Sequence, residues 1–325
     1  MLKDQPLAPQ SRSPRRWRPH RSRAQPQEVI VGAHINDIQQ LDFKTNNYVI
    51  DLYVWFRWQS PDADPSKTME FMNRFASDDN LREELTETPD ELPDGRRYSI
   101  IRYQGLFSTK FQLAEFPFDT QSLTVVMEDT LEGSATQIYV PDGKSPVKVN
   151  PIITLPGFSM GTPTMHISKY TYATDFGDPT VPKAEPYSRV TVSIPLARPV
   201  VAMSIKTFVP IILIVACALF VYFVRPIYVE GRIGLGITAL LTLVAIQLTA
   251  TSSLPDVDYL LMLDQVFLLA YLFIIVALAR VVATSWQGEG EGEEQAIKTN
   301  DRRWALGTLA LYLVASIAVL WTSLA

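Results

Sequence analysis

Hydrophobic residues alternate in the first two thirds of the chain and form long unbroken runs in the last third. In NYVIDLYVWFRW (47–58) every second residue is apolar: Tyr48, Ile50, Leu52, Val54, Phe56 and Trp58. A period of two is typical of a β-strand that buries one face. The alternation recurs in 123–127 and 190–196, and turns rich in Pro, Gly and Asp separate these segments. The pattern predicts an antiparallel β-sandwich over residues 26–197, in which 65–88 forms a short helix or a long loop.

The apolar runs predict four membrane-spanning helices, since a helix needs about 20 mostly apolar residues to cross a bilayer. We expect a membrane domain over residues 198–325, with residues 284–303 as the loop before the last helix. The predicted helices cover residues 200–223, 231–254, 259–283 and 304–324.

The distribution of basic residues predicts the orientation in the membrane. Arginine and lysine lie between the first two helices and near the loop 284–303, whereas LPDVD, between helices two and three, has neither. Because cytoplasmic loops are enriched in Lys and Arg, residues 26–197 are expected outside the cell and 284–303 in the cytoplasm. Residues 1–25, with six arginines, would oppose this orientation and are expected to be a disordered basic tail. They contain no apolar core of a secretory signal, so either a signal has been removed or the chain starts elsewhere.

Composition argues against several classes of function. Residues 26–197 hold 24 Asp and Glu but only 14 Lys and Arg, and this acidity disfavours nucleic-acid binding and favours attraction of cations. One cysteine, Cys217, and three histidines make a disulfide framework, a metal site or a cofactor ligand set unexpected. No catalytic triad or phosphate-binding loop is evident, since GEGEGEE lacks the strand-to-helix setting and fits a flexible linker. We therefore predict neither an enzyme nor a cofactor.

Residues 230–252 carry an ordered stripe at helical spacing. It runs from a carboxylate, through small and polar residues, to apolar turns and a polar end. Around a symmetry axis this stripe would line a pore with a hydrophobic constriction and an acidic inner ring. The alternative is that Thr238, Thr242 and Thr249 bond to their own helix and that Glu230 reaches the headgroups. The stripe consists of Glu230, Gly234, Thr238, Leu241, Ala245, Leu248 and Ser252.

The segment FQLAEFPFDTQSL (111–123) resembles the signature loop of the pentameric ligand-gated ion channels, the Cys-loop receptor superfamily. Thr109 and Leu123 occupy the positions of the two loop cysteines, a departure similar to the prokaryotic branch. The resemblance spans residues 28–325. Its further matches, in chain order, are Trp58, Arg198-Pro199, Pro210, Leu241 and Pro255.

The resemblance implies a homopentamer in the plasma (inner) membrane of a prokaryote, in contact with lipid. Agonist would bind between neighbouring extracellular or periplasmic sandwiches and open a pore lined by the stripe. Leu241, Ala245 and Leu248 would form the gate, and the Glu230 ring would select cations, with monovalent cations as the permeant ions. Arg232, about 200° around the helix from Glu230, is expected to face protein or headgroups. Glu-Gly-Arg at 230–232 differs from the Pro-Ala-Arg usual in the family's anion channels.

In the family, residues matching Asp119 and Arg198 pair where the two domains meet. The alternative is that Asp119 caps its own turn and Arg198 meets lipid headgroups. Asp42 is a further candidate for this coupling, and Pro255 and Asp256 are expected beneath the sandwich, where they would receive its movement.

Family ligand sites are boxes of aromatic rings suited to cationic amines. The resemblance implies the site residues Tyr53, Tyr170, Tyr172, Phe176 and Tyr187. Tyr53 is otherwise a half-exposed strand residue, and two of the others could belong to the core. Thr130 replaces an expected aromatic and no Trp-x-Pro-Asp segment is evident, so we do not expect a simple amine as the agonist. The candidates are another small molecule, a proton or a divalent ion.

A membrane-anchored solute sensor without a pore is the alternative function. It would need a cytoplasmic effector, and residues 284–303 are few for one. An enzyme with a membrane tail is a third class, without a catalytic motif to support it.

Overall fold

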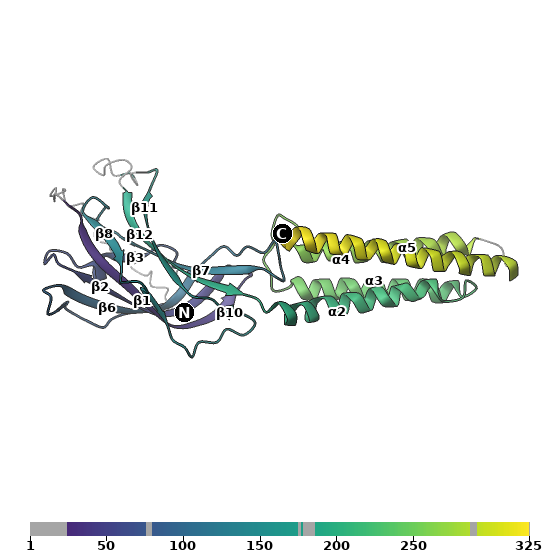
Figure 1. Cartoon of the computed structure of the whole chain (residues 1–325), viewed down its shortest axis with the longest axis horizontal. Helices are drawn as coiled ribbons and strands as arrows, with labels where there is room; N and C mark the ends of the chain where they lie inside the picture. The colour runs from purple at the N-terminus through teal and green to yellow at the C-terminus, as the bar shows by residue number, and fades with distance from the viewer. Residues whose placement is uncertain (1–24, 76–79, 175–176, 178–185, 287–290, 325) are drawn as a thin grey trace, which may run out of the picture.

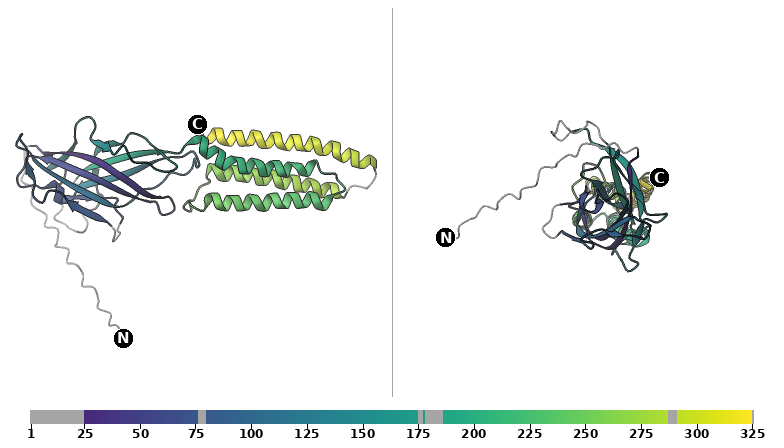
Figure 2. Two further views of the ribbon diagram at one scale, coloured as in Figure 1. Left: turned by 90° about the horizontal axis from the view of Figure 1, so that it is seen from below. Right: turned by 90° about the vertical axis from the view of Figure 1, so that its left-hand side faces the viewer.

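The structure is a computed structural model that describes residues 25–75, 80–174, 177, 186–286 and 291–324. A β-rich head and a bundle of long helices lie end to end (Figures 1 and 2). The end of the last helix returns to the side of the bundle that meets the head (Figure 1).

The head is a sandwich of a seven-stranded and a five-stranded sheet. The first contains β1 (Gln27–Asp42), β2 (Asn47–Trp58), β4 (Leu81–Glu84), β5 (Asp90–Glu91), β6 (Arg97–Ser108), β8 (Gln137–Pro141) and β9 (Val147–Val149). The second contains β3 (Met69–Phe71), β7 (Thr120–Asp129), β10 (Ser159–Met160), β11 (Thr164–Thr171) and β12 (Pro186–Ala197). In residues 65–88 a short helix, α1 (Pro65–Thr68), precedes β3 and β4.

The alternating positions form the core as predicted. The apolar face of β2 is fully buried from Tyr48 to Trp58, and so are the matching faces of β7 and β12. The antiparallel prediction is incomplete, because β1 pairs in parallel with β8 and β9. Residues far apart in sequence form these parallel pairs, so alternation within one strand carries no information about them.

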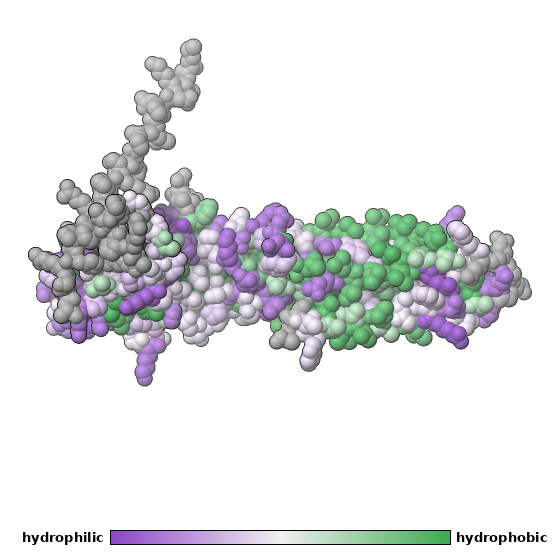
Figure 3. All heavy atoms as spheres, turned by 90° about the horizontal axis from the view of Figure 1, so that it is seen from above, coloured by the Kyte–Doolittle hydropathy of each residue, from purple (hydrophilic) through white to green (hydrophobic). Residues whose placement is uncertain are grey.

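In the part of the chain that the structure describes, four helices are long and apolar enough to cross a membrane. They are α2 (Val200–Leu219), extended by the 3-10 turn η1 (Phe220–Tyr222), then α3 (Val229–Thr251), α4 (Met262–Ser285) and α5 (Glu291–Leu324). On the face shown in Figure 3 the helices form an apolar surface, with hydrophilic residues at the end far from the head.

The start of the last helix differs from the prediction. Residues 291–303, expected as part of a loop, form the first turns of α5. Glu, Gln, Ala, Lys and Arg are good helix formers even without an apolar run. Ion pairs also support these turns: Lys298 Nζ lies 2.9 Å from Glu294 Oε1, four residues earlier, and Arg225 contacts Glu294 from the α2–α3 connection.

Candidate functional site: a helix stripe, a domain junction and an aromatic cluster

The seven stripe residues all lie on the exposed side of α3. Glu230, Gly234, Thr238 and Leu241 are exposed, and so are Ala245, Leu248 and Ser252. Leu241 and Leu248 are 64% and 67% exposed, although they are large apolar side chains. The opposite face of α3 is buried against the other helices at Arg232, Gly236, Ala239 and Leu243. Among the described residues of one chain, no element therefore covers the stripe.

Two of the three threonines, Thr242 and Thr249, also satisfy the simpler interpretation. Thr242 Oγ1 donates to the Thr238 carbonyl at 2.8 Å, and Thr249 Oγ1 donates to the Ala245 carbonyl at 2.9 Å. These bonds use the hydroxyl proton but leave the oxygen able to accept another hydrogen bond. Backbone bonding and a water-facing role are therefore compatible.

Arg232 faces away from the stripe, as expected from its spacing. It is buried and pairs with Asp301 of α5. The remaining charge on α3 is the exposed carboxylate of Glu230, which lies in the first turn of the helix.

Asp119 and Arg198 form an ion pair where the head meets the helices. Arg198 Nε lies 2.8 Å from Asp119 Oδ1, and the Asp119 side chain is 1% exposed. The strand register explains this contact: Thr120 of β7 pairs with Ala197 of β12, so the residues just outside both strands are neighbours. Asp119 also accepts from Gln121 Nε2.

Three phenylalanines surround the same guanidinium. Arg198 Cζ lies 4.7 Å from the ring centroid of Phe43, 4.9 Å from that of Phe116 and 4.7 Å from that of Phe158. The negative ring faces favour a cation. Sequence reasoning missed this cage because its members come from three separate loops.

Asp42 does not join this pair. Its side chain is exposed and accepts from the backbone N–H groups of Lys44 and Thr45, which closes its own turn. Hydrogen bonding by Thr45 outweighs the opposing effect of burial and lowers the pKa of Asp42 below its usual value. The next residue, Phe43, contacts Arg198 instead.

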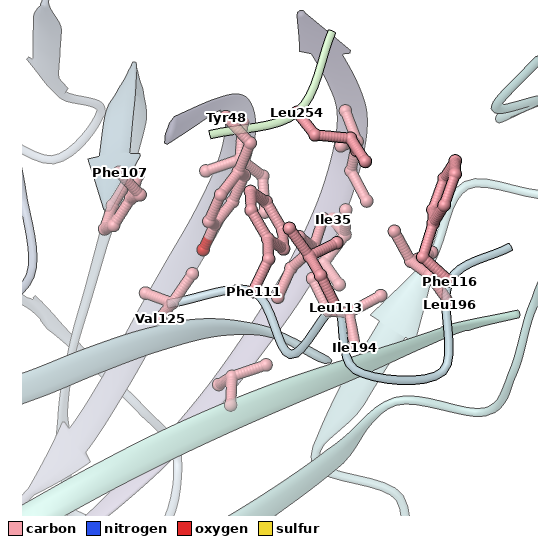
Figure 4. Close-up of a cluster of buried hydrophobic side chains, with 14 of the residues drawn as sticks. Ile35, Tyr48, Phe107, Phe111, Leu113, Phe116, Val125, Ile194, Leu196 and Leu254 are labelled. Carbon is pink, nitrogen blue, oxygen red and sulfur yellow. The ribbon is translucent and has the colours of Figure 1, made fainter. Parts of the chain in front are cut away.

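The signature loop rests on the α3–α4 connection and on the first residue of α4. The Met262 N–H donates to the Ala114 carbonyl at 2.8 Å, and the Leu113 N–H donates to Tyr259 Oη at 3.2 Å. Figure 4 shows Leu254 of the connection in one apolar cluster with Phe111 and Leu113. Asp256 is exposed and Pro255 half-buried in this connection, and the described contacts to the signature loop come from their neighbours.

The predicted ligand residues are brought together in part. Tyr170 and Tyr172 have ring centroids 4.9 Å apart, and Tyr172 and Tyr187 have centroids 5.8 Å apart. Phe176 lies outside the described residues. Tyr53 lies on the other sheet, where Arg102 Cζ is 5.5 Å from its ring centroid. Within one chain the described ligand candidates thus lie on two separate surfaces, with Tyr170, Tyr172 and Tyr187 on one and Tyr53 on the other.

An internal cation already occupies part of the tyrosine cluster. Arg189 Cζ lies 3.4 Å from the Tyr170 centroid, and Arg189 Nε pairs with the buried carboxylate of Glu128. Tyr172 Oη donates to Glu128 Oε2 at 2.7 Å. Burial, followed by the Glu128 carboxylate, raises the pKa of Tyr172 to about 12. Tyr187 and Arg189 lie two positions apart on β12 and therefore share a face of the strand. This spacing could have indicated that Arg189 belongs to the tyrosine cluster.

Comparison with known proteins agrees with this architecture. The profile of the neurotransmitter-gated ion-channel transmembrane region matches residues 207–302, from α2 into α5. The chain is 25% identical over 212 residues to a gamma-aminobutyric acid receptor subunit beta of Caenorhabditis elegans, a match that covers 61% of this chain and 36% of the relative. The chain belongs to the Cys-loop family of ligand-gated ion channels.

Two other relatives of this Cys-loop protein are similarly distant. A gamma-aminobutyric acid receptor subunit beta-like protein of Drosophila melanogaster is 24% identical over 205 residues, 63% of this chain and 39% of the relative. The pH-sensitive chloride channel 2 of Anopheles gambiae is 22% identical over 268 residues, 72% of this chain and 42% of the relative. The matches thus span well under half of the relatives' own length.

The family establishes an integral membrane protein with an extracellular N-terminal domain. Its members are channels and not enzymes. These three relatives come from animals, so a prokaryotic origin stays a prediction.

Proposed function

We propose that this chain forms a ligand-gated ion channel in which five copies place α3 around a central pore. The uncovered stripe on α3 is the observation that carries this proposal. Leu241 and Leu248 are more than 60% exposed on one helix face that leads to the exposed Glu230. Apolar rings of this kind gate a pore by excluding water.

Cation selectivity is the finer part of the proposal. The support is local: Glu230 is exposed at the inner end of the stripe, whereas the nearby Arg232 is buried and paired. Five carboxylates around one narrow mouth favour cations. The name of one relative, pH-sensitive chloride channel 2, points to anions. At 22% identity we give more weight to the charges of this chain.

The coupling role of the domain junction is likewise a proposal. The Asp119–Arg198 pair and the contact of the signature loop with the α3–α4 connection form a continuous path from β7 and β12 to the pore helix. A movement of the head would displace the outer end of α3 through this path. Pro255 and Asp256 would move with that end.

The tyrosine cluster is the candidate agonist site, completed by Tyr53 of a neighbouring copy. Arg189 already stacks on Tyr170, so a simple amine would have to displace a paired guanidinium. We therefore favour as the agonist a small molecule with more than one charge. A proton or a divalent ion that acts elsewhere on the acidic head is the alternative.

The test is current recording from purified protein in planar bilayers under a salt gradient. The pH is stepped first, and then amines and divalent cations are added. Ligand-dependent unitary currents that reverse toward the cation potential are expected. Absence of current in an assembly that is not pentameric would favour the sensor function instead.

Cysteine accessibility provides a matched control for the pore face. The chain has one cysteine, so Cys217→Ser gives a cysteine-free background. In it, a charged thiol reagent is expected to block current through Ala245→Cys, on the exposed face, and to spare Ala239→Cys, on the buried face. Equal block of both variants would contradict the assignment of the stripe.

A further inference from the structure

Three charged side chains form a buried cluster at the end of the helix bundle far from the head. Arg232 of α3, Arg280 of α4 and Asp301 of α5 meet there, and Arg232 and Asp301 are each 1% exposed. Arg232 Nη2 lies 2.6 Å from Asp301 Oδ2, and Arg280 Nε lies 2.9 Å from Asp301 Oδ1. One carboxylate therefore binds two guanidinium groups, one on each oxygen.

Further contacts fix Arg232 in this position. Its Nε donates to the Val221 carbonyl of η1 at 2.9 Å, and its Nη1 lies 3.5 Å from Thr284 Oγ1 of α4. Removal of one partner from a buried ion pair is strongly destabilising, because it leaves a charge without compensation. Asp301 is thus the residue that allows the guanidinium of Arg232 to stay inside the bundle.

The cluster separates the two charges of α3. Glu230 and Arg232 are the charged residues of this helix, and they lie two positions apart in its first turns. Two positions correspond to about 200° around the helix axis. Glu230 is consequently exposed on the stripe while Arg232 points into the bundle.

We propose that Asp301 is a positioning residue for ion selectivity, which holds Arg232 away from the pore and leaves Glu230 as the unopposed charge of the inner mouth. This inference rests on the proposed function. It places part of the selectivity mechanism on α5, a helix outside the predicted pore lining. Without Asp301, the Arg232 guanidinium would leave the bundle and cancel part of the carboxylate field.

A matched pair of double variants separates this role from general stabilisation. R232Q/D301N and R280Q/D301N remove the same carboxylate and one guanidinium each, so they have equal net charge. The first leaves Arg280, next to the Trp304 ring at 5.7 Å. The second leaves Arg232 without its carboxylate partner.

The experiment measures the reversal potential of each variant in planar bilayers under a salt gradient, with the wild type recorded first. R232Q/D301N is expected to keep the cation-to-anion permeability ratio of the wild type. In R280Q/D301N this ratio is expected to decrease several-fold. D301N alone is expected to behave like R280Q/D301N, and D301E to recover part of the preference. Failure of R280Q/D301N alone to assemble would also support the inference, because an unpartnered Arg232 would then be the group that the bundle cannot hold.

Equal behaviour of the two double variants, in selectivity or in assembly, would overturn the inference. A wild type that conducts ions without cation preference would overturn it too, since Glu230 would then set no selectivity. A wild type that conducts no ions at all under any ligand contradicts the proposed function itself, which distinguishes the two failures.

Discussion

Replacement of Asp119 by Asn is expected to destabilise the protein more than most single substitutions. Asp119 is 1% exposed and the Arg198 side chain is 10% exposed, so the variant leaves a guanidinium without its charged partner in a mostly dry junction. The cost of breaking such a pair is about 3–5 kcal/mol. For a domain of 150–250 residues, about 1 kcal/mol shifts the melting temperature by about 2–4 °C. We therefore expect a decrease of about 6–20 °C.

The assay is size-exclusion chromatography of solubilised protein after heating, with all variants heated for the same time. Asp42→Asn is the control, because Asp42 is exposed and closes only its own turn. The melting temperature of Asp42→Asn is expected to decrease only slightly. If both variants melted at the same temperature, the Asp119–Arg198 pair would make no special contribution to thermal stability.

A double-mutant cycle tests the pair directly. Asp119→Asn, Arg198→Gln and the double variant are compared, and residues in contact show coupling energies of about 0.5–3 kcal/mol. The charge-reversed pair, Asp119→Arg with Arg198→Asp, is expected to recover stability and gating only in part. The reversed carboxylate would face the three phenylalanine rings that now surround a cation. Strictly additive losses would refute the reasoning.

Three further predictions concern the pore and the ligand site. Leu241→Ser should place a polar group in the apolar constriction, so that less agonist opens the channel; unchanged activation in dose–response recordings would argue against Leu241 as a gate. Glu230→Gln should weaken the cation preference, and a reversal potential that does not shift in a salt gradient would remove Glu230 from the selectivity mechanism. Arg189→Gln should free the Tyr170 ring face and lower the amine concentration that activates the channel in dose–response recordings; an unchanged concentration would argue against amine binding at Tyr170.

The sequence predicted the parts of the structure that local pattern determines. The buried face of β2 follows from its period of two, and four apolar runs of sufficient length give the four helices. The orientation of Arg232 followed from helix geometry alone. The Asp119–Arg198 contact required the family resemblance, because 79 residues separate its members.

Long-range pairing set the limits of prediction. Parallel pairing of β1 with β8 joins segments about a hundred residues apart, and no feature of either strand indicates it. Asp301 lies in a polar stretch that was predicted to be a loop. Arg280 did give a signal, since a charge within an apolar membrane run requires a partner. Arg280 is one of the basic residues near the loop 284–303 that predict the orientation, and its position does not reveal which carboxylate it meets.

The length of α5 has a mechanical consequence. Its 34 residues measure about 51 Å at 1.5 Å per residue, whereas the hydrocarbon core of a bilayer is about 30 Å thick. Part of this helix therefore projects beyond the hydrocarbon as a stiff rod, and Asp301 lies on it about 15 Å from its first residue. Asp301 pairs with Arg232 of α3, so in the proposed channel we expect a tilt of α5, caused by a thinner or thicker bilayer, to shift the first turn of α3 as well. The thickness of the lipid would then influence the charge at the inner mouth.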